Sequence, residues 1–256
     1  MIDTHTHLYL RDAFPDGGVE AVKKAVEAGV SRMILPNIDR ESVSPLLALH
    51  SLFPSETFVA AGLHPTEVGA DWKQELDDIL ALFEDYNLVG IGEIGLDLHW
   101  EKKHIVLQMD AFAAQLELAR EKNLPAIVHS RDAFAETVEV LKMMSGELPE
   151  IVFHSFTYST KEADGFLSVA ENAHFGFNGV ITFKNAREVR EAAQFVGIEK
   201  IVAETDSPYL APVPFRGTRN ESAYLPYIVR AIGEATSTSP DKAEETITRN
   251  SEKLFF

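Results

Sequence analysis

The stretch Leu88-Val-Gly-Ile-Gly-Glu-Ile94 is a short apolar run that carries one acidic side chain, Glu93, near its end. Continuous apolar runs of this length are typical of strands that are covered on both faces, as in parallel sheets. Further along the chain, Val106–Lys122 has the spacing of apolar residues that predicts an amphipathic helix. A strand followed by a helix is the repeating unit of an α/β fold.

The same alternation extends outward from this stretch over the whole chain. The other predicted strands are Ile2–His7, Arg32–Pro36, Thr57–Leu63, Ala126–His129, Ile151–His154, Ala173–Phe177 and Lys200–Thr205. The other predicted helices are Gly18–Ala28, Val43–Leu52, Trp72–Tyr86, Ala133–Met143, Ala186–Val196, Tyr224–Ala235 and Pro240–Leu254. About eight strand–helix units in 256 residues favour a closed (β/α)8 TIM barrel over an open doubly wound sheet. No linker or shift in composition divides the sequence, so we expect one domain over residues 1–256.

Composition restricts the chemistry. The chain has no cysteine, so any metal must be bound by imidazole and oxygen ligands. The formal net charge of −17 argues against general DNA binding through the phosphate backbone, although bound divalent cations can reverse the local sign of the field. The first residues do not resemble a signal peptide and no apolar stretch is long enough to span a membrane. We therefore expect a cytoplasmic protein with no membrane partner and no obligatory protein partner.

Titratable side chains recur where the predicted strands end. They are His5, His7, His64, Glu93, Asp97, His129, Arg131, Asp132, His154, Glu204 and Asp206. In a parallel barrel the carboxyl ends of the strands converge on one rim, which carries the active site of this fold. The sequence therefore predicts that these residues, distant in the chain, share one site.

The first and the last predicted strand each end in a pair of candidate metal ligands. His5 and His7 are two residues apart, so on a strand both imidazoles point to the same face and can reach one ion. Glu204 and Asp206 have the same spacing. Paired carboxylates of this kind can bind a metal and accept a proton from its water.

Glu93 is the most informative residue of the set. A carboxylate at the end of an apolar strand is costly to bury unless it is paired or bound to metal. It could be a core glutamate in a salt bridge, or it could bridge two ions with its two oxygens, and we favour the bridge. His129 and His154 end consecutive strands and would complete the site. This mixture of imidazoles and carboxylates suits zinc, manganese or magnesium.

His64 and Arg131 fall on the same predicted rim and are suited to hold an anionic substrate oxygen. For Arg131, an ion pair with Asp132 or with the surroundings of Glu93 is an equal alternative. We interpret His50, His99, His104 and His174 as surface residues. The motifs G-x-x-x-x-G-K-[ST], G-x-S-x-G and H-E-x-x-H are absent, which argues against a P-loop nucleotide site, a serine hydrolase and a zincin.

Together these segments resemble the TatD family of metal-dependent deoxyribonucleases. The matching segments are Ile2-Asp-Thr-His-Thr-His-Leu8, Gly62-Leu-His-Pro65, Ile91-Gly-Glu-Ile-Gly-Leu-Asp97, Leu124-Pro-Ala-Ile-Val-His-Ser-Arg-Asp-Ala133, Glu204-Thr-Asp-Ser-Pro-Tyr-Leu-Ala-Pro212, Val213-Pro-Phe-Arg-Gly-Thr-Arg-Asn220 and Asn250-Ser-Glu-Lys-Leu-Phe255. The resemblance implies a (β/α)8 barrel that hydrolyses phosphodiester bonds of DNA, at single strands or ends, with two divalent ions.

The resemblance also implies residue roles. His5, His7, Glu93 and Asp206 would hold one ion, and Glu93, His129 and His154 the other. Glu204 would bind a further ion or assist proton transfer, with Asp206 as the main proton acceptor, and His64 and Arg131 would meet the substrate phosphate. Leu98 and Tyr158 depart from the family pattern, and we expect both to lie on the rim, where Tyr158 would narrow the cleft.

Two other functions remain open. Related barrels hydrolyse amides, lactones or small phosphotriesters, often with a lysine in the fourth strand, where this chain has Glu93. A binding protein that has lost its chemistry would lack metal ligands, and none is missing here.

Overall fold

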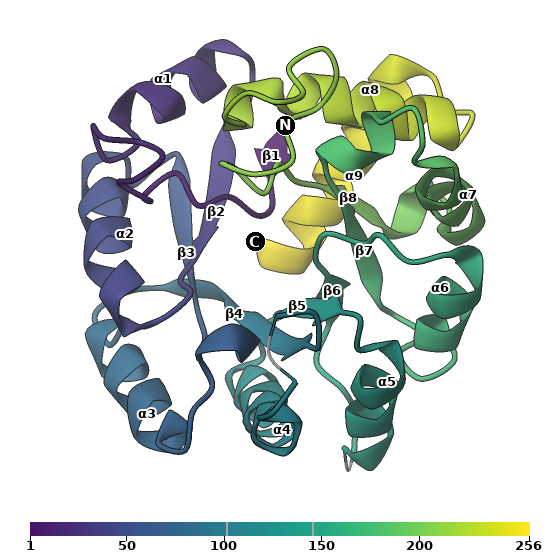
Figure 1. Cartoon of the computed structure of the whole chain (residues 1–256). Helices are drawn as coiled ribbons and strands as arrows, with labels where there is room; N and C mark the ends of the chain where they lie inside the picture. The colour runs from purple at the N-terminus through teal and green to yellow at the C-terminus, as the bar shows by residue number, and fades with distance from the viewer. Residues whose placement is uncertain (101, 145) are drawn as a thin grey trace.

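The computed structural model describes residues 1–100, 102–144 and 146–256, and its eight parallel strands pair in chain order from β1 to β8. The strands are β1 (Ile2–Asp3), β2 (Arg32–Pro36), β3 (Thr57–Ala61), β4 (Leu88–Asp97), β5 (Ala126–Arg131), β6 (Ile151–Phe153), β7 (His174–Phe177) and β8 (Ile201–Ala203). The helices are α1 (Val19–Glu27), α2 (Arg40–Leu52), α3 (Trp72–Leu82), α4 (Ile105–Lys122), α5 (Phe134–Met143), α6 (Thr160–Leu167), α7 (Arg187–Val196), α8 (Leu225–Ala235) and α9 (Pro240–Phe255). Figure 1 shows helices α1 to α8 around the ring of strands, which confirms the predicted (β/α)8 TIM barrel. No described helix has the length and apolar character needed to cross a membrane.

The barrel closes where the first strand meets the last. The backbone nitrogen of Thr4 donates to the Ala203 carbonyl at 3.2 Å, and the nitrogen of Asp206 donates to the His5 carbonyl at 2.9 Å. His7 N then donates to Ser207 O at 2.8 Å. The regular part of β1 is thus shorter than the predicted strand, yet these bonds fix the backbone that carries His5 and His7.

Neighbouring residues of each strand face opposite sides of the sheet, as the two-residue period requires. One set packs inside the barrel with the end of α9 and consists of Ile34, Ala60, Ile127, Val152, Val202, Leu254 and Phe255. The other set packs outward against the helices and includes Leu35, Val59, Val128, Phe153 and Ala203. Both faces of the strands are therefore covered, which explains why the strands are apolar on both faces.

Strand β4 extends to Asp97, three residues beyond its predicted end. Its pairing with β5 is irregular between Ile91 and Ile94, because Ile91 pairs with Ala126 and Ile94 pairs with Val128. One extra residue on β4 is therefore accommodated next to Glu93. Bulges of this kind re-aim side chains beside active sites.

Three helices differ clearly from the prediction. Helix α3 ends at Leu82, four residues before its predicted end at Tyr86. Helix α2 begins at Arg40, earlier than predicted, because the Asp39 side chain accepts a hydrogen bond from Ser42 N at 2.7 Å and caps the first turn. Helix α6 was not predicted, since it is short and contains Gly165. Its start is fixed by Ser159 and Glu162, which form a capping box.

Candidate metal centre

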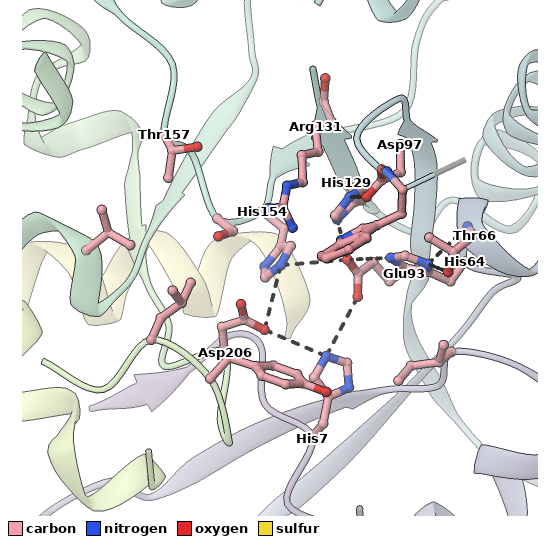
Figure 2. A pocket seen from close by; sticks show the side chains of 17 residues that line it. His7, His64, Thr66, Glu93, Asp97, His129, Arg131, His154, Thr157 and Asp206 are labelled. Atoms are coloured by element: carbon pink, nitrogen blue, oxygen red, sulfur yellow. Dashed lines mark hydrogen bonds and ion pairs between the residues drawn. The ribbon is translucent and has the colours of Figure 1, made fainter. Parts of the chain in front are cut away.

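A cavity of about 660 Å³ opens where the strands end on their carboxyl side. Its walls include His7, His64, Glu93, Asp97, Trp100, His129, Arg131, His154, Tyr209, Leu210, Val180 and Asp206. Figure 2 shows His7 and Asp206 facing Glu93, His129 and His154. The structure thus brings together most of the strand-end residues that the sequence predicts to share one rim, although His5, Asp132 and Glu204 do not line the cavity.

Glu93 lies at the centre of the cluster, and its two oxygens face different histidines. Oε2 lies 3.2 Å from His5 Nε2 and 3.7 Å from His7 Nε2. Oε1 lies 2.8 Å from His129 Nδ1, 3.4 Å from His64 Nε2 and 3.7 Å from His154 Nε2. Burial opposes the negative charge, but His64, His5 and His154 hold the pKa of Glu93 well below its usual range. The group therefore stays ionised while buried.

The protonation of His7 is set by a hydrogen-bond chain behind it. The Tyr9 hydroxyl lies 2.5 Å from the carbonyl oxygen of Pro36, which can only accept, so Tyr9 donates there. Tyr9 then accepts from His7 Nδ1 at 2.9 Å. Burial lowers the pKa of His7 to about 4, so the ring is neutral near pH 7 and its Nε2 keeps a lone pair. A neutral imidazole held in this way is the form that binds metals.

His5 and Asp206 complete this side of the cluster. Burial lowers the pKa of His5 well below its usual value. Its Nε2 lies 3.0 Å from His7 Nε2, and Asp206 Oδ1 lies 3.8 Å from the same nitrogen of His7. Burial first, and then the charges of Glu93 and Glu204, raise the pKa of Asp206 to about 7. Neutral imidazole nitrogens and carboxylate oxygens therefore converge in one place.

His129 lies between two carboxylates. Its Nδ1 faces Glu93, and its Nε2 lies 3.0 Å from Asp97 Oδ2. Burial opposes protonation of His129, but hydrogen bonds to Asp97 and Glu93 raise its pKa. Asp97 also accepts from the backbone nitrogens of His99 and Trp100, so its position is fixed independently of His129. Asp97 therefore holds the orientation of the His129 ring.

His154 is oriented from behind by Glu204. His154 Nδ1 lies 2.9 Å from Glu204 Oε1, and that oxygen accepts from Ser155 N at 2.6 Å. Although burial opposes its charge, the carboxylates of Glu204, Glu93 and Asp206 raise the pKa of His154 to about 10. Glu204 fits because β7 has Gly176 beside it, where a Cβ would lie 2.3 Å from Glu204 Oε2. Glu204 is buried and does not line the cavity.

Arg131 and His64 lie at the mouth of the site. The Arg131 guanidinium lies 5.4 Å from the centre of the Trp100 ring and lines the cavity. Asp132, its alternative partner, contacts His99 at 3.0 Å instead. His64 Nδ1 lies 2.7 Å from Thr66 Oγ1, while its Nε2 faces Glu93. His64 is thus closer to the proposed metal ligands than a residue that only meets substrate needs to be.

Within the part of the chain that the structure describes, three groups of histidines and carboxylates have ligand atoms within 4.8 Å of one another. They are His5 with His7 and Asp206, His5 with Glu93 and His154, and His64 with Glu93 and His129. Imidazole nitrogens and carboxylate oxygens at such separations form a donor set that fits divalent cations. The first group contains three of the four residues predicted for the first ion and lacks Glu93. The residues predicted for the second ion do not form one group, because Glu93 is grouped with His5 and His154 and, separately, with His64 and His129.

Some residues were placed differently or not anticipated. Tyr158, expected to narrow the cleft, lies outside the cavity lining because its hydroxyl bonds to Ser130 Oγ and Ala133 N. Tyr9 and Trp100 were missed. Tyr9 follows the His5 and His7 pattern at the next two-residue step, a signal that the sequence did contain. His174, interpreted as a surface residue, begins β7 and is partly buried.

Comparisons with known proteins agree with this geometry. The family model described as TatD related DNase matches residues 2–256. The chain is 32% identical over its full length to a Bacillus subtilis protein named uncharacterized metal-dependent hydrolase YabD, covering 98% of that protein. It is 31% identical, again over its full length, to one named uncharacterized metal-dependent hydrolase TatD from Mycobacterium tuberculosis, covering 97% of it.

Solved structures of the same fold are also similar. The crystal structure of YJJV, a TatD homologue from Escherichia coli, aligns with a TM-score of 0.87 at 27% identity, covering all of this chain and 97% of that one. A TatD family hydrolase from Entamoeba histolytica aligns with a TM-score of 0.86 over the whole chain and 98% of its own, and at 20% identity it supports the fold alone. With imidazoles and carboxylates gathered on the rim of a barrel, the chain belongs to the TatD family and is a metal-dependent hydrolase.

Proposed function

We propose that this hydrolase cleaves phosphodiester bonds of DNA, at single strands or ends, with two divalent ions of magnesium, manganese or zinc. The proposal rests on the two carboxylate oxygens of Glu93, which face different histidines. Oε2 faces His5 and His7. Oε1 faces His64, His129 and His154. A carboxylate shared in this way suits a pair of ions, and paired ions are a common arrangement in enzymes that cleave phosphodiesters.

We propose the ligands that the resemblance to the family implies, and the contacts of Glu93 with histidines of both sets support them. His5, His7, Glu93 and Asp206 would hold one ion, and Glu93, His129 and His154 the other. When bound, the ions would activate a water molecule and offset negative charge on the phosphate. Asp97 and Glu204 would act as positioning residues, because each holds the ring of a histidine and Glu204 does not line the cavity.

The remaining groups have roles toward water and substrate. With Oδ1 of Asp206 turned toward His7 and His154, we assign its other oxygen, Oδ2, as the acceptor of the water proton. The Arg131 guanidinium at the mouth of the cavity would hold phosphate oxygens through its planar set of donors. His64 would donate to the same phosphate or join the second ion.

Glu93→Ala tests the proposal directly. Metal-free protein is reloaded with magnesium, manganese or zinc, and hydrolysis of single-stranded and duplex DNA is followed with the 3′ or 5′ end blocked. We expect the variant to retain no tightly bound metal and to lose at least about 10³-fold in rate. Glu41→Ala is the matched control, since Glu41 is an exposed carboxylate in the first turn of α2, on the same side of the barrel.

Two results would count against the proposal. An active Glu93→Ala variant would refute the shared-carboxylate assignment. A wild-type protein that hydrolyses simple amides, lactones or phosphotriesters but leaves every DNA substrate intact would instead favour the small-molecule hydrolase that the acidic surface keeps open.

A further inference from the structure

A second cleft, of about 550 Å³, lies outside the catalytic cavity. Its walls come from the 3₁₀ helix η2 (Gly179–Thr182), the residues before α7, helix α8 and the loop at Val213. Three cationic side chains line it, Lys184, Arg190 and Arg230, together with one carboxylate, Glu234. In a chain of net charge −17, a cleft with an excess of cations is unusual.

The second cleft shares a wall with the catalytic cavity. Val180 and Leu210 line the catalytic cavity, while Ile181, Thr182 and Val213 line the second cleft. The two segments are bonded to each other, since Val213 N donates to Thr182 Oγ1 at 2.9 Å. One layer of chain therefore separates the two spaces.

The second cleft begins at the same end of the barrel as the catalytic cavity and extends along α8 to Ala235. Helix α7 begins at Arg187, after the chain leaves the carboxyl end of β7 at Phe177. Lys184 lies in this connection and so is at the rim that carries the metal ligands. A chain-like ligand can therefore occupy both spaces by crossing the ridge at Tyr209 and Leu210, which are 54% and 38% exposed.

The cations of the second cleft are available to a ligand. Lys184 and Arg230 are exposed, as is Arg216, whose guanidinium lies 4.3 Å from the centre of the Phe183 ring that lines the cleft. Over residues 1–100, 102–144 and 146–256, no ion pair joins any of these three to an acidic side chain. Arg190 has a different role, because it donates to the carbonyls of Ile181 and Phe183 and fixes the wall.

We propose that the second cleft binds the phosphates of the single-stranded nucleic acid beyond the bond that is cleaved, with Lys184, Arg216 and Arg230 as the contacts. The proposal rests on the proposed function, because the strand must enter the metal site. Unpaired cations on an acidic molecule attract a polyanion only where they are concentrated, as they are here. Tyr209 and Tyr227, both exposed, offer faces on which bases can stack.

The test compares substrates of two lengths. A single strand of about 20 nucleotides spans both spaces, whereas one of about four occupies the catalytic cavity alone. The triple variant Lys184→Gln, Arg216→Gln, Arg230→Gln removes the three contacts and leaves the metal ligands intact. The control triple Lys122→Gln, Lys142→Gln, Lys253→Gln removes the same charge from exposed positions near the ends of α4, α5 and α9.

We expect the first triple variant to raise KM for the long strand by about tenfold or more with kcat unchanged, and to leave the short strand unaffected. The salt dependence of long-strand binding, log Kd against log salt, should lose about 2 from its slope, because each single-strand phosphate contact contributes about 0.7. The control triple should behave as wild type.

The outcomes separate the two proposals. If the wild type cleaves neither strand, the proposed function fails and this inference fails with it. If the wild type cleaves both and the first triple variant matches the control triple in KM and in salt slope, the proposed function stands and the second cleft does not bind the strand. An acidic protein as its natural occupant would give this second result.

Discussion

Tyr9 controls the metal site without touching the cavity, because it fixes which nitrogen of His7 carries the proton. Tyr9→Phe removes the acceptor for His7 Nδ1 and leaves the Pro36 carbonyl unpaired. We expect metal affinity to fall about tenfold or more, measured by competition with a chelator. The free energy of unfolding should fall by about 1–2 kcal/mol as a buried acceptor loses its donor.

Tyr86→Phe is the matched control for Tyr9→Phe. Tyr86 lies on the outside of the barrel after α3, where its ring packs against Phe83. It should leave metal affinity unchanged. Equal metal affinity in Tyr9→Phe and wild type would show that His7 does not depend on the hydroxyl.

His174 gives the barrel a pH-dependent term in its stability. Burial, followed by the nearby charges of Lys200 and Lys253, lowers the pKa of His174 from 6.5 to about 4. Between these values the unfolded chain binds the proton more readily than the folded one, so stability is lost as the pH falls from 6.5 to 4. Allowing for partial exposure, we expect this residue to contribute about 2 kcal/mol to that loss.

His174→Gln should therefore lose less stability than wild type when urea unfolding is compared at pH 7 and at pH 4.5. The difference between the two proteins isolates His174 from the other histidines. Gln194→Ala, at an exposed position of α7 without a titratable group, should lose as much as wild type. A variant His174→Gln with an unchanged pH dependence would contradict the assignment.

At the scale of the element, β4 depends on Gly95. Its φ is +130°, a conformation that L side chains rarely adopt, and a Cβ there would lie 2.0 Å from the His129 carbonyl oxygen. Gly95→Ala must therefore shift β4 away from β5, where the backbone of His129 lies. We expect urea unfolding to show a loss of about 3 kcal/mol or more, together with weaker metal binding.

Gly197→Ala is a suitable control for Gly95→Ala. Gly197 also has a positive φ, +77°, but a Cβ there meets open space. Its cost should be backbone strain alone, about 1 kcal/mol. If both variants lose the same amount, the close approach of β4 to β5 has no energetic weight.

Much of the element pattern could be predicted from sequence, and its failures have physical causes. Continuous apolar runs identify the eight strands, because each strand is buried on both faces. The extent of β4 was underestimated because Gly95 and Asp97 are poor strand formers in isolation, and only pairing with β5 extends the strand. Helix α6 was missed because its eight residues give few periods of apolar spacing.

The site was partly predictable for the same kind of reason. Strand-end positions place His5, Glu93, His129, His154 and Asp206 together once the barrel is assumed. The carboxylates that orient these histidines could not be predicted, because each contact joins residues far apart in the sequence. The contact of Asp97 with His129 and that of Glu204 with His154 are examples.

At the scale of the whole molecule, one end of the barrel carries the candidate metal site and the other contributes to stability. The metal ligands gather at the carboxyl ends of the strands, while Leu254 and Phe255 fill the interior on the side of α9. Phe255→Ala should cost about 3 kcal/mol of stability and leave kcat unchanged at a temperature where the variant is folded. Thermal unfolding and steady-state kinetics on one sample would measure both.

Phe256→Ala is the control for Phe255→Ala, since Phe256 is 50% exposed. It should cost about 1 kcal/mol or less. A fall in kcat for Phe255→Ala without unfolding would mean that the two ends of the barrel are coupled.

Closure of the barrel by Thr4 and Ala203 has a consequence for biosynthesis. His5 leaves the ribosome about 200 residues before Asp206, an interval of about 10–40 s at ordinary rates of translation. During that time a nascent chain exposes His5 and His7 with no complete site around them. Tight metal uptake should therefore wait until the chain has been made beyond Asp206, and bound metal would report that the barrel has closed.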